Sequence, residues 1–414
     1  MGAQENGFDV IVAGAGYVGL TIAVAIAEAR PSLKVAVVDA APEGAWQRDG
    51  RASAIAAAAV RMLERLGCWQ EIAPKAQAIT DMVITDSRTA DPVRPVFLTF
   101  EGEVAPGEAF AHMVFNRDLN AALRARAGAL GVDLIEGIGV CGFEAGARDA
   151  TVHLADGVSL RTRLLVAADG VRSRLRDMAG IGTVHWDYGQ SGIVCTVGHE
   201  RPHGGRAEEH FLPAGPFAIL PLAPAEDGTN RSSIVWSEKT ADAERLVAAD
   251  EIVFEAELET RFGLKLGEIR VLSKPRAWPL GLTLARDFVR PRFALAGDAA
   301  HGIHPIAGQG LNLGLRDAAA LAETVVEADR LGQDIGALDV LERYQQWRRF
   351  DTLRMGITTD VLTRMFSNDF APLRAARDLG LGLVERMPRL KDYFIRQAAG
   401  LSDRAPRLLR GEAI

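Results

Sequence analysis

A glycine-rich turn between a predicted strand and a predicted helix is the feature that most constrains this chain. The stretch FDVIVAGAGYVGLTIAVAIAEA places Gly14, Gly16 and Gly19 after a β-rich run at 8–13 and before an alanine-rich helical pattern that ends at Ala29. In this spacing the first glycine permits a tight turn, the second lets a phosphate approach the backbone, and the third lets helix and strand pack closely. The stretch therefore predicts a βαβ unit whose helix N-terminus binds the pyrophosphate of a dinucleotide.

An acidic residue completes this unit. The next β-rich run, VAVVDA, ends at Asp39, twenty residues beyond Gly19, where a carboxylate can accept hydrogen bonds from ribose hydroxyls. The alternative to dinucleotide binding is a glycine turn in an ordinary βαβ unit. The pattern alone does not separate NAD from FAD.

Two later segments favour FAD. In VAADGVRSRLR a strand leads into Asp169 and Gly170, followed by Ser173 and Arg176. In RFALAGDAA we expect a strand that ends at Asp298. An acid at such a strand end can hold the ribityl chain of a flavin, which favours FAD over NAD.

The segment after Asp298 is rich in glycine and then becomes helical in pattern, as NLGLRDAAALAETVV. The backbone N–H groups of Gly310, Leu311 and Asn312 lie where this helix begins. Such donors can stabilise negative charge on a reduced flavin ring.

Composition excludes several classes of protein. The 414 residues are too many for one simple core and predict two or three lobes. The net charge of −7 gives no case for nucleic-acid binding. Cys68, Cys141 and Cys195 are far apart, so we expect buried free thiols in a reducing compartment. Glu5 and Asp9 precede the first apolar run, which argues against a signal peptide.

No metal site is expected. His301 and His304 lie three residues apart, but no carboxylate-rich or cysteine-rich segment is nearby. His199, His203 and His210 lie in or beside the turn sequence RPHGG, and we expect a solvated turn there.

Together these motifs carry a family resemblance. GxGxxG, the DGxxSxxR segment and the GDAAHxxxPxxGQGxNLGxxDA segment occur in this order. In this they resemble the group A FAD-dependent aromatic hydroxylases. The segments RASAIAAAAV, FNRDLNAAL, HPIAGQGLNLGLRD and YQQWRRFD are most similar to the ubiquinone-biosynthesis hydroxylases.

The resemblance implies specific cofactor contacts. Arg51 would lie near the flavin and pyrophosphate, with a surface arginine in an alanine-rich helix as the alternative. Arg117 would contact the FAD, with a helix-start salt bridge as the alternative. Pro305 and Gln309 would line the flavin loop, and no side chain is assigned as a catalyst. The remaining implied FAD-binding residues are Gly14, Gly16, Gly19, Asp39, Asp169, Asp298, Gly310, Leu311 and Asn312.

The activity implied by the resemblance is monooxygenation. NAD(P)H would reduce FAD, and a flavin C4a-hydroperoxide formed with O2 would transfer oxygen to the aromatic ring of a polyprenylated phenol in ubiquinone biosynthesis. A hydroxylase of a small soluble aromatic and a non-hydroxylating flavoprotein are the alternatives. The ring position, the choice between NADH and NADPH, and the prenyl chain length are not encoded in a readable motif.

The implied fold is α/β, like that of para-hydroxybenzoate hydroxylase: a Rossmann-type FAD domain with an inserted β-sheet substrate domain and C-terminal helices. β-like runs such as GPFAILPLA and RSSIVWSE, separated by Pro/Gly turns, indicate the inserted sheet. Phe217 in the first of these runs is expected to pack in the core. We expect FAD-binding parts at 1–78, 106–182 and 278–345, substrate-domain strands at 79–105, the β-sheet substrate domain at 183–277 and a C-terminal helical region at 346–414.

The last segment differs in charge from the rest. Residues 361–414 hold ten basic and six acidic side chains in a helical pattern. Contact with an anionic membrane surface or a lipid-carrying complex is one interpretation. A solvated helical face or a homo-oligomer contact is the other. The predicted location is the cytoplasm, with the inner face of the membrane as a peripheral site.

Overall fold

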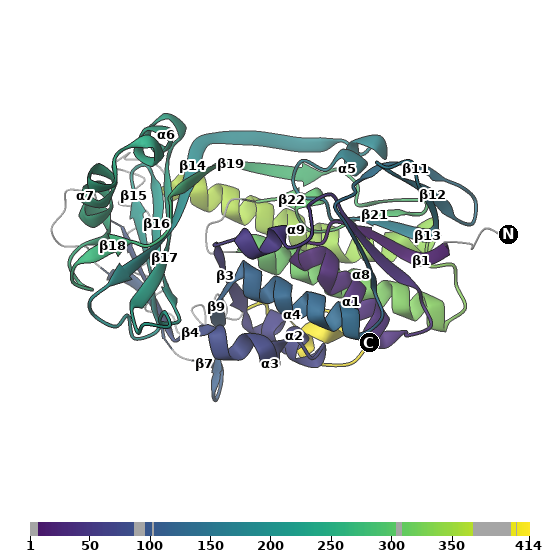
Figure 1. The fold of residues 1–414 in the computed structure, drawn as a ribbon, viewed down its shortest axis with the longest axis horizontal. Coiled ribbons are helices and arrows are strands. Elements are labelled where there is room, and N and C mark those ends of the chain that lie inside the picture. Colours follow the sequence, from purple (N-terminus) through teal and green to yellow (C-terminus); the bar gives the residue numbers. More distant parts are fainter. Residues whose placement is uncertain (1–6, 87–95, 102, 304–308, 367–398, 403) are drawn as a thin grey trace.

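The computed structural model describes residues 7–86, 96–101, 103–303, 309–366, 399–402 and 404–414. Two lobes lie along the long axis of the molecule. Two long strands, β14 (Thr183–His199) and β19 (Arg276–Ala285), run from one lobe into the other (Figure 1). The domain limits suggested at 183 and 277 therefore fall at the start of β14 and inside β19, and the division into domains stays a prediction.

The larger lobe is built on a mixed sheet covered by helices. β1 lies parallel between β2 and β13, and β10 and β21 extend this parallel part on either side. α1 packs against α8 and α4, and the apolar residues of β1, β2 and α1 form the centre of the largest core. Its elements are β1 (Gly7–Ala13), α1 (Tyr17–Ala29), β2 (Val35–Asp39), α4 (Asn116–Ala129), β10 (Asp133–Glu136), β11 (Val140–Ala145), β12 (Ala150–Leu154), β13 (Ser159–Ala167), α5 (Arg174–Met178), β20 (Val289–Arg290), β21 (Phe293–Leu295), α8 (Gln309–Arg330) and α9 (Leu338–Phe366).

A small three-stranded sheet stands between the lobes. Its order is β3–β9–β4, and it is preceded and followed by short helices and hairpins. These elements are β3 (Ala52–Ala56), α2 (Ala57–Arg65), α3 (Trp69–Ile72), β4 (Gln77–Ile79), β7 (Glu103–Ala105), β8 (Glu108–Ala109) and β9 (Ala111–Phe115).

The smaller lobe is built on most of a nine-stranded, mainly antiparallel sheet. The order is β22–β19–β14–β17–β16–β15–β5–β6, with β18 on β14. α6 and α7 cover one face, where Phe217 is fully buried against Trp236, so this residue packs in the core as expected. The other face meets β9 through Ala207 and Leu222. The elements not yet given are β5 (Asp81–Asp86), β6 (Val96–Glu101), β15 (Arg206–Leu212), β16 (Gly215–Leu222), β17 (Asn230–Lys239), α6 (Thr240–Ala248), α7 (Glu251–Phe262), β18 (Ile269–Val271) and β22 (His301–Gly302).

One local prediction is wrong, and one alternative interpretation is excluded. The strand expected to reach Asp298 ends at Leu295, because Gly297 adopts φ +62° and turns the chain into a short 3₁₀ helix. Residues 52–56, the start of the alanine-rich helix considered for Arg51, instead form β3. Pairing with β9 overrides the helix propensity of alanine there, and α2 begins only at Ala57.

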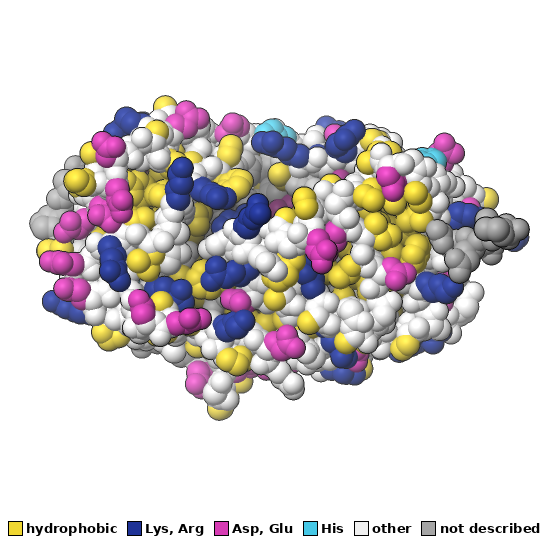
Figure 2. Space-filling model, viewed as in Figure 1, with side chains coloured by type: hydrophobic (Ala, Val, Ile, Leu, Met, Phe, Trp, Pro, Cys, Tyr) yellow, Lys and Arg dark blue, Asp and Glu magenta, His cyan; other side chains and the backbone are white. Residues whose placement is uncertain are grey.

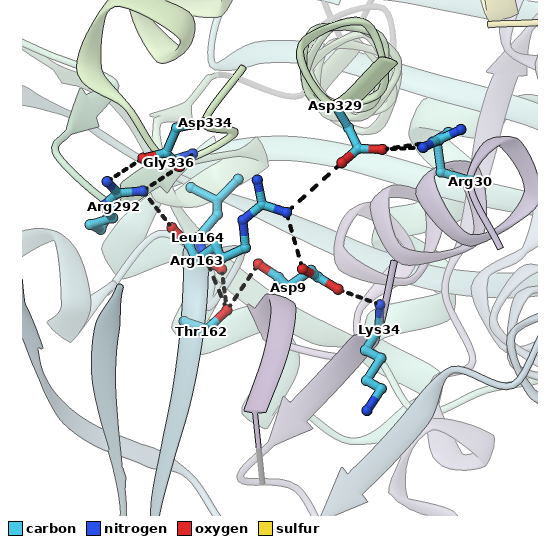
Figure 3. Close-up of polar contacts among 10 residues, drawn as sticks. All are labelled: Asp9, Arg30, Lys34, Thr162, Arg163, Leu164, Arg292, Asp329, Asp334 and Gly336. Atoms are coloured by element: carbon cyan, nitrogen blue, oxygen red, sulfur yellow. Dashed lines mark hydrogen bonds and ion pairs between the residues drawn. The ribbon is translucent and has the colours of Figure 1, made fainter. Parts of the chain in front are cut away.

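Ion pairs link strands and helices at the edge of the larger lobe that lies away from the glycine turn (Figure 3). Arg163 on β13 reaches Asp9 at 3.2 Å and Asp329 at 3.8 Å, and Arg30 pairs with the same Asp329. Arg292 pairs with Asp334. These contacts tie the C-terminal end of α8 to β13 and to the C-terminal side of α1, and so fix α8 along the sheet.

The packing of α1 on α8 requires a glycine. A Cβ at Gly314 would lie 2.6 Å from Cγ2 of Val18. We expect Gly314→Ala to lower the free energy of unfolding by roughly 1–3 kcal/mol through overpacking, despite the better helix propensity of alanine. Gly128→Ala in α4 is the control, because a Cβ there meets no described atom within 4 Å. It should match or exceed wild-type stability in urea unfolding, and equal stability of the two variants would contradict the packing argument.

Candidate functional site

The glycine turn presents open backbone donors. Gly14 has φ +112°, and a Cβ there would lie 2.3 Å from the carbonyl oxygen of Ala168. A Cβ at Gly19 would lie 2.0 Å from the carbonyl oxygen of Gly14. At Gly16, in contrast, a Cβ would meet no described atom within 4 Å, and among the described residues no side chain caps α1. The first N–H groups of α1 therefore point into free space, where an anion fits.

Two charged side chains shape this turn. Asp39 accepts hydrogen bonds from the N–H groups of Ala15 and Ala41, so the carboxylate is fixed beside the turn. Arg124 on α4, which the sequence reasoning missed, lies with Nη2 3.4 Å from the carbonyl oxygen of Ala15 and pairs with Glu136. Its Nε is buried without a hydrogen-bond partner among the described residues. A donor held in this way fits a phosphate oxygen.

A second group of side chains converges from three distant segments. Arg51 forms a bidentate pair with Asp49, at 2.8 and 2.7 Å. Burial raises the pKa of Tyr17, and the nearby charge of Asp298 raises it further, while Arg51 lowers it. Burial likewise raises the pKa of Asp298, against the lowering effects of His301 and Arg51. Arg51, Tyr17 and Asp298 therefore lie within electrostatic range of one another.

Asp298 is solvent-accessible although enough protein surrounds it to raise its pKa. The carboxyl group of Asp298 therefore lies in a recess of the surface that is open to solvent. That recess is bordered by the glycine turn through Tyr17 and by the segment of Arg51.

The DG segment is clamped to the segment of Asp298. Ser173 caps α5 by accepting the N–H of Arg176 at 3.0 Å. The buried guanidinium of Arg176 donates to the carbonyl oxygens of Val171 and Ala299, both at 3.1 Å. Asp169 is exposed and has a long contact of 3.5 Å with the N–H of Leu175, so its carboxylate is available to a ligand.

A buried carboxylate organises the turn that carries Asp298. Asp317 on α8 accepts from the N–H of Gly297 at 2.9 Å, from Nε2 of His301 at 2.5 Å and from Nε of Arg348 at 2.7 Å. The side chains of Asp317, His301 and Arg348 are fully buried. Burial raises the pKa of Asp317, but its electrostatic interactions and hydrogen bonds with His301 and Arg348 outweigh burial, so this pKa lies below its ordinary value.

The start of α8 is held against β3. The side-chain amide of Asn312 donates to the carbonyl oxygen of Ala54 and accepts from the N–H of Ala56. Leu311 is buried in the core, and a Cβ at Gly310 would meet no described atom within 4 Å. Pro305 and the side chain of Gln309 lie outside the described residues.

Arg117 lies at the boundary between the lobes. Its guanidinium is 4.6 Å from the ring centroid of Phe115, and Arg231 of β17 is 5.3 Å from the same ring. Burial lowers the pKa of Arg231, and the charge of Arg117 lowers it further. Figure 2 shows basic side chains gathered where the lobes meet, around a hollow. The described contacts of Arg117 do not include the glycine turn, so its contact with FAD stays a prediction.

The other candidate ligands have structural roles. His199 and His210 are buried in β14 and β15, not in a solvated turn as expected, and His203 holds the turn between them through Leu222 and Gly205. In the described part of the chain no cluster of His, Cys, Asp and Glu could hold a metal ion. Cys68 and Cys195 are buried free thiols as expected, whereas Cys141 is exposed.

These features fit one class of cofactor. The open N-terminus of α1, the unpartnered Nε of Arg124 and the exposed carboxyl group of Asp298 near Tyr17 form a series of polar groups around the start of α1. Such a series suits the extended shape of FAD, whose ring chemistry the protein would bind and orient. The geometry thus defines a flavoprotein with a second, sheet-based lobe.

Comparisons with known proteins identify the family. Residues 7–349 match the model of the FAD binding domain family. The chain is 45% identical over 417 residues to a ubiquinone hydroxylase, UbiL, of Rhodospirillum rubrum, covering 99% of this chain and 94% of that protein. It is 33% identical to the 3-demethoxyubiquinol 3-hydroxylase of Escherichia coli, with 95% and 98% covered. The structure of p-nitrophenol 4-monooxygenase PnpA from Pseudomonas putida superimposes with a TM-score of 0.77 at 20% identity, covering 94% and 97%.

The chain belongs to this family of FAD-binding monooxygenases, and its close relatives are ubiquinone hydroxylases. The predicted fold class and the predicted FAD cofactor are confirmed. The individual FAD-contacting residues stay predictions.

Asp317 provides a test of how the turn that carries Asp298 is held in place. We expect Asp317→Asn to lower the free energy of unfolding by about 3–5 kcal/mol, because it leaves the buried guanidinium of Arg348 without its main partner. FAD occupancy of the purified protein should fall with it, measured by the ratio of flavin to protein absorbance. The stabilising effect of Asp317 is present above its ordinary pKa and lost as the pH falls through its lowered pKa.

The matched control is Asp351→Asn, which removes the other carboxylate on Arg348. Asp351 lies 2.9 Å from Nη1 of Arg348 but is about a third exposed, so the loss should be at most about 1 kcal/mol. Equal losses of unfolding free energy in the two variants would show that the buried pair does not hold the turn of Asp298 in place.

Proposed function

We propose that this chain hydroxylates the aromatic ring of a polyprenylated phenol in ubiquinone biosynthesis, with FAD as cofactor and NAD(P)H and O2 as co-substrates. The observation that carries the proposal is the near full-length similarity to the ubiquinone hydroxylase of Rhodospirillum rubrum. The site supports it, because the lobes meet around a hollow (Figure 2), and Arg51, expected near the flavin, lies 5.4 Å from the ring of Trp278 on the sheet that joins them.

In this proposal the chain's residues bind and orient the cofactor. FAD, when bound, takes a hydride from NAD(P)H and delivers one oxygen atom of O2 to the ring. The open N–H groups after Gly14, Gly16 and Gly19 hold the pyrophosphate, with Arg124 beside them. The proposed contacts along the rest of the cofactor are Asp39 on the ribose, Asp298 on the ribityl chain, and Arg51, Arg117, Asp169, Pro305, Gln309, Gly310, Leu311 and Asn312 near the ring or the reductant.

The second lobe supplies the substrate wall. Its sheet turns one face toward β9 of the small sheet between the lobes, and aliphatic residues on that face are only half-buried. An apolar wall of this kind suits a prenylated ring and keeps water from the reacting atoms.

A gene deletion tests the pathway assignment. In the organism that carries the gene, we expect ubiquinone to fall and a polyprenyl phenol lacking one ring oxygen to accumulate, measured by mass spectrometry of the quinone lipids. The structure of that lipid identifies the hydroxylated carbon. An unchanged quinone profile in aerobic cells without a second hydroxylase of this family would contradict the assignment.

Purified protein separates the two alternatives. O2 consumption with NAD(P)H that depends on a small soluble phenol, but not on prenylated ones, would favour the small-aromatic hydroxylase. O2 consumption that no phenol stimulates would favour a non-hydroxylating flavoprotein.

We also propose that the basic segment at 361–414 brings the enzyme to an anionic lipid surface. The support is its excess of basic side chains, and residues 367–398 lie outside the described part. Of the helices in the described residues, none has the length and hydropathy to cross a membrane. Binding to vesicles containing anionic lipid should be strong at low salt and weak at high salt, in a flotation assay. Absence of binding at low salt would refute this proposal.

A further inference from the structure

One row of side chains crosses the second lobe's sheet on the face that meets the larger lobe. Strand register aligns Glu209 with Ile84 on β5 and with Ala218 on β16. The row continues through Val235 on β17 and Val194 on β14. Ala207, two residues before Glu209 on the same face, packs in the cluster that contains Ala111 and Met113 of β9.

The direction of this face is fixed by its other contacts. Arg231, on the same face of β17 as Val235, lies over Phe115 of β9. Trp278, two residues along β19 from the register partner of Val194, lies 5.4 Å from the guanidinium of Arg51. Glu209 therefore points into the space between the sheet and the larger lobe, the side on which the flavin residues lie.

Glu208, the preceding residue, has the opposite orientation. It pairs with Lys265, which follows α7, and lies 3.6 Å from Nε2 of His210. Its carboxylate is thus engaged on the outer face of the sheet. Two adjacent glutamates of the same strand therefore have separate environments.

Glu209 lies buried in a row that is otherwise apolar from Ile84 to Val194, and no described basic side chain pairs with it. It is 4% exposed, whereas its row neighbours Ile84, Ala218, Val235 and Val194 are half-buried. Those aliphatic side chains therefore border a space that the described residues do not fill. Among the described residues, Glu209 has no hydrogen-bond or ion-pair partner, which is costly for a buried carboxyl group unless a ligand supplies one.

We propose that Glu209 is the general base of the reaction: its carboxylate accepts a hydrogen bond from the phenolic hydroxyl of the substrate and takes its proton during oxygen transfer. This inference rests on the proposed function. The phenolic O–H bond breaks, the proton moves to the carboxylate, and the electron pair stays on oxygen, where it makes the ring carbons more nucleophilic. The attacked carbon then loses its hydrogen as a proton to water, and Glu209 returns its proton to the original phenolic oxygen.

The acidity of Glu209 suits this role. Burial alone raises its pKa to about 7, near the pH at which a general base works best. Arg231 and Arg276 share its face; Arg231 donates to the carbonyl oxygen of Ala223 and Arg276 is exposed at the end of the row. His112 of β9 packs on Trp69, and on α9 Arg348 and Asp351 are paired with each other.

The test compares Glu209→Gln with Glu208→Gln in the full-length, FAD-loaded protein. The ligand is a phenol that carries one short isoprenoid chain next to its hydroxyl group, titrated against the oxidised flavin spectrum without reductant. For wild type, affinity should weaken about tenfold as the pH falls from above to below 7, because the carboxylate is a better acceptor than the neutral acid. Glu208→Gln should keep this dependence, and Glu209→Gln should lose it.

Turnover gives the second readout. We expect kcat for Glu209→Gln to fall by roughly 10²–10⁴, the usual effect of losing a general base, with KM changing far less. Glu209→Asp should recover part of kcat and restore a pH-dependent limb, which a merely structural role would not do. Flavin content and far-UV circular dichroism confirm that each variant is folded.

The outcomes separate the two proposals. If wild type binds and hydroxylates the phenol while Glu209→Gln behaves like wild type, the role of Glu209 is refuted and the proposed function stands. If wild type binds no prenylated phenol at any pH, the proposed function fails and this inference fails with it.

Discussion

One buried carboxylate determines where the turn that carries Asp298 lies. Asp317 on α8 holds the N–H of Gly297 and the ring of His301, which belong to one turn, and the guanidinium of Arg348 on α9. Breaking such a buried pair costs several kcal/mol, whereas forming it adds little net stability. Its main effect is therefore positional: it fixes the turn that carries Asp298 relative to α8 and α9.

The position of that turn in turn determines how the motifs meet. Gly297 and Gly314 both lie against Val18 of α1, so the glycine turn, the Asp298 turn and α8 come together around one side chain. Arg176 adds the DG segment through the carbonyl oxygen of Ala299. Motifs from the beginning, middle and end of the larger lobe are thus joined by close contacts rather than by long flexible loops. A cofactor that touches all three would find them already arranged, which limits the ordering cost of binding.

Sequence reasoning predicted the parts of this site that depend on local pattern. β1, α1 and β2 follow from strand-turn-helix spacing, and the glycine contacts have the expected geometry. It missed Asp317 and Arg348, although both lie in quoted motifs, because a buried pair between two helices leaves no local pattern. It also missed Arg124, whose place beside Ala15 depends on how α4 packs on α1. The helix considered for residues 52–56 failed for the same reason, since β9 is distant in the chain.

Buried polar groups in this protein divide according to whether the chain itself supplies their partners. Asp317, Arg348 and Arg176 each have hydrogen-bond partners within the protein and hold segments together, although Nη2 of Arg348 and Nε of Arg176 have no hydrogen-bond partner among the described residues. The carboxyl group of Glu209 and the Nε of Arg124 have no such partner among the described residues, although both are buried. Since an unpaired buried polar group is unfavourable, a ligand that supplies the partner removes that cost on binding. The two groups lie on different sides of the site, one beside the phosphate-binding turn and one on the sheet wall. A cofactor phosphate would satisfy the first and a substrate hydroxyl the second, so one argument from hydrogen bonding accounts for both ends of the site.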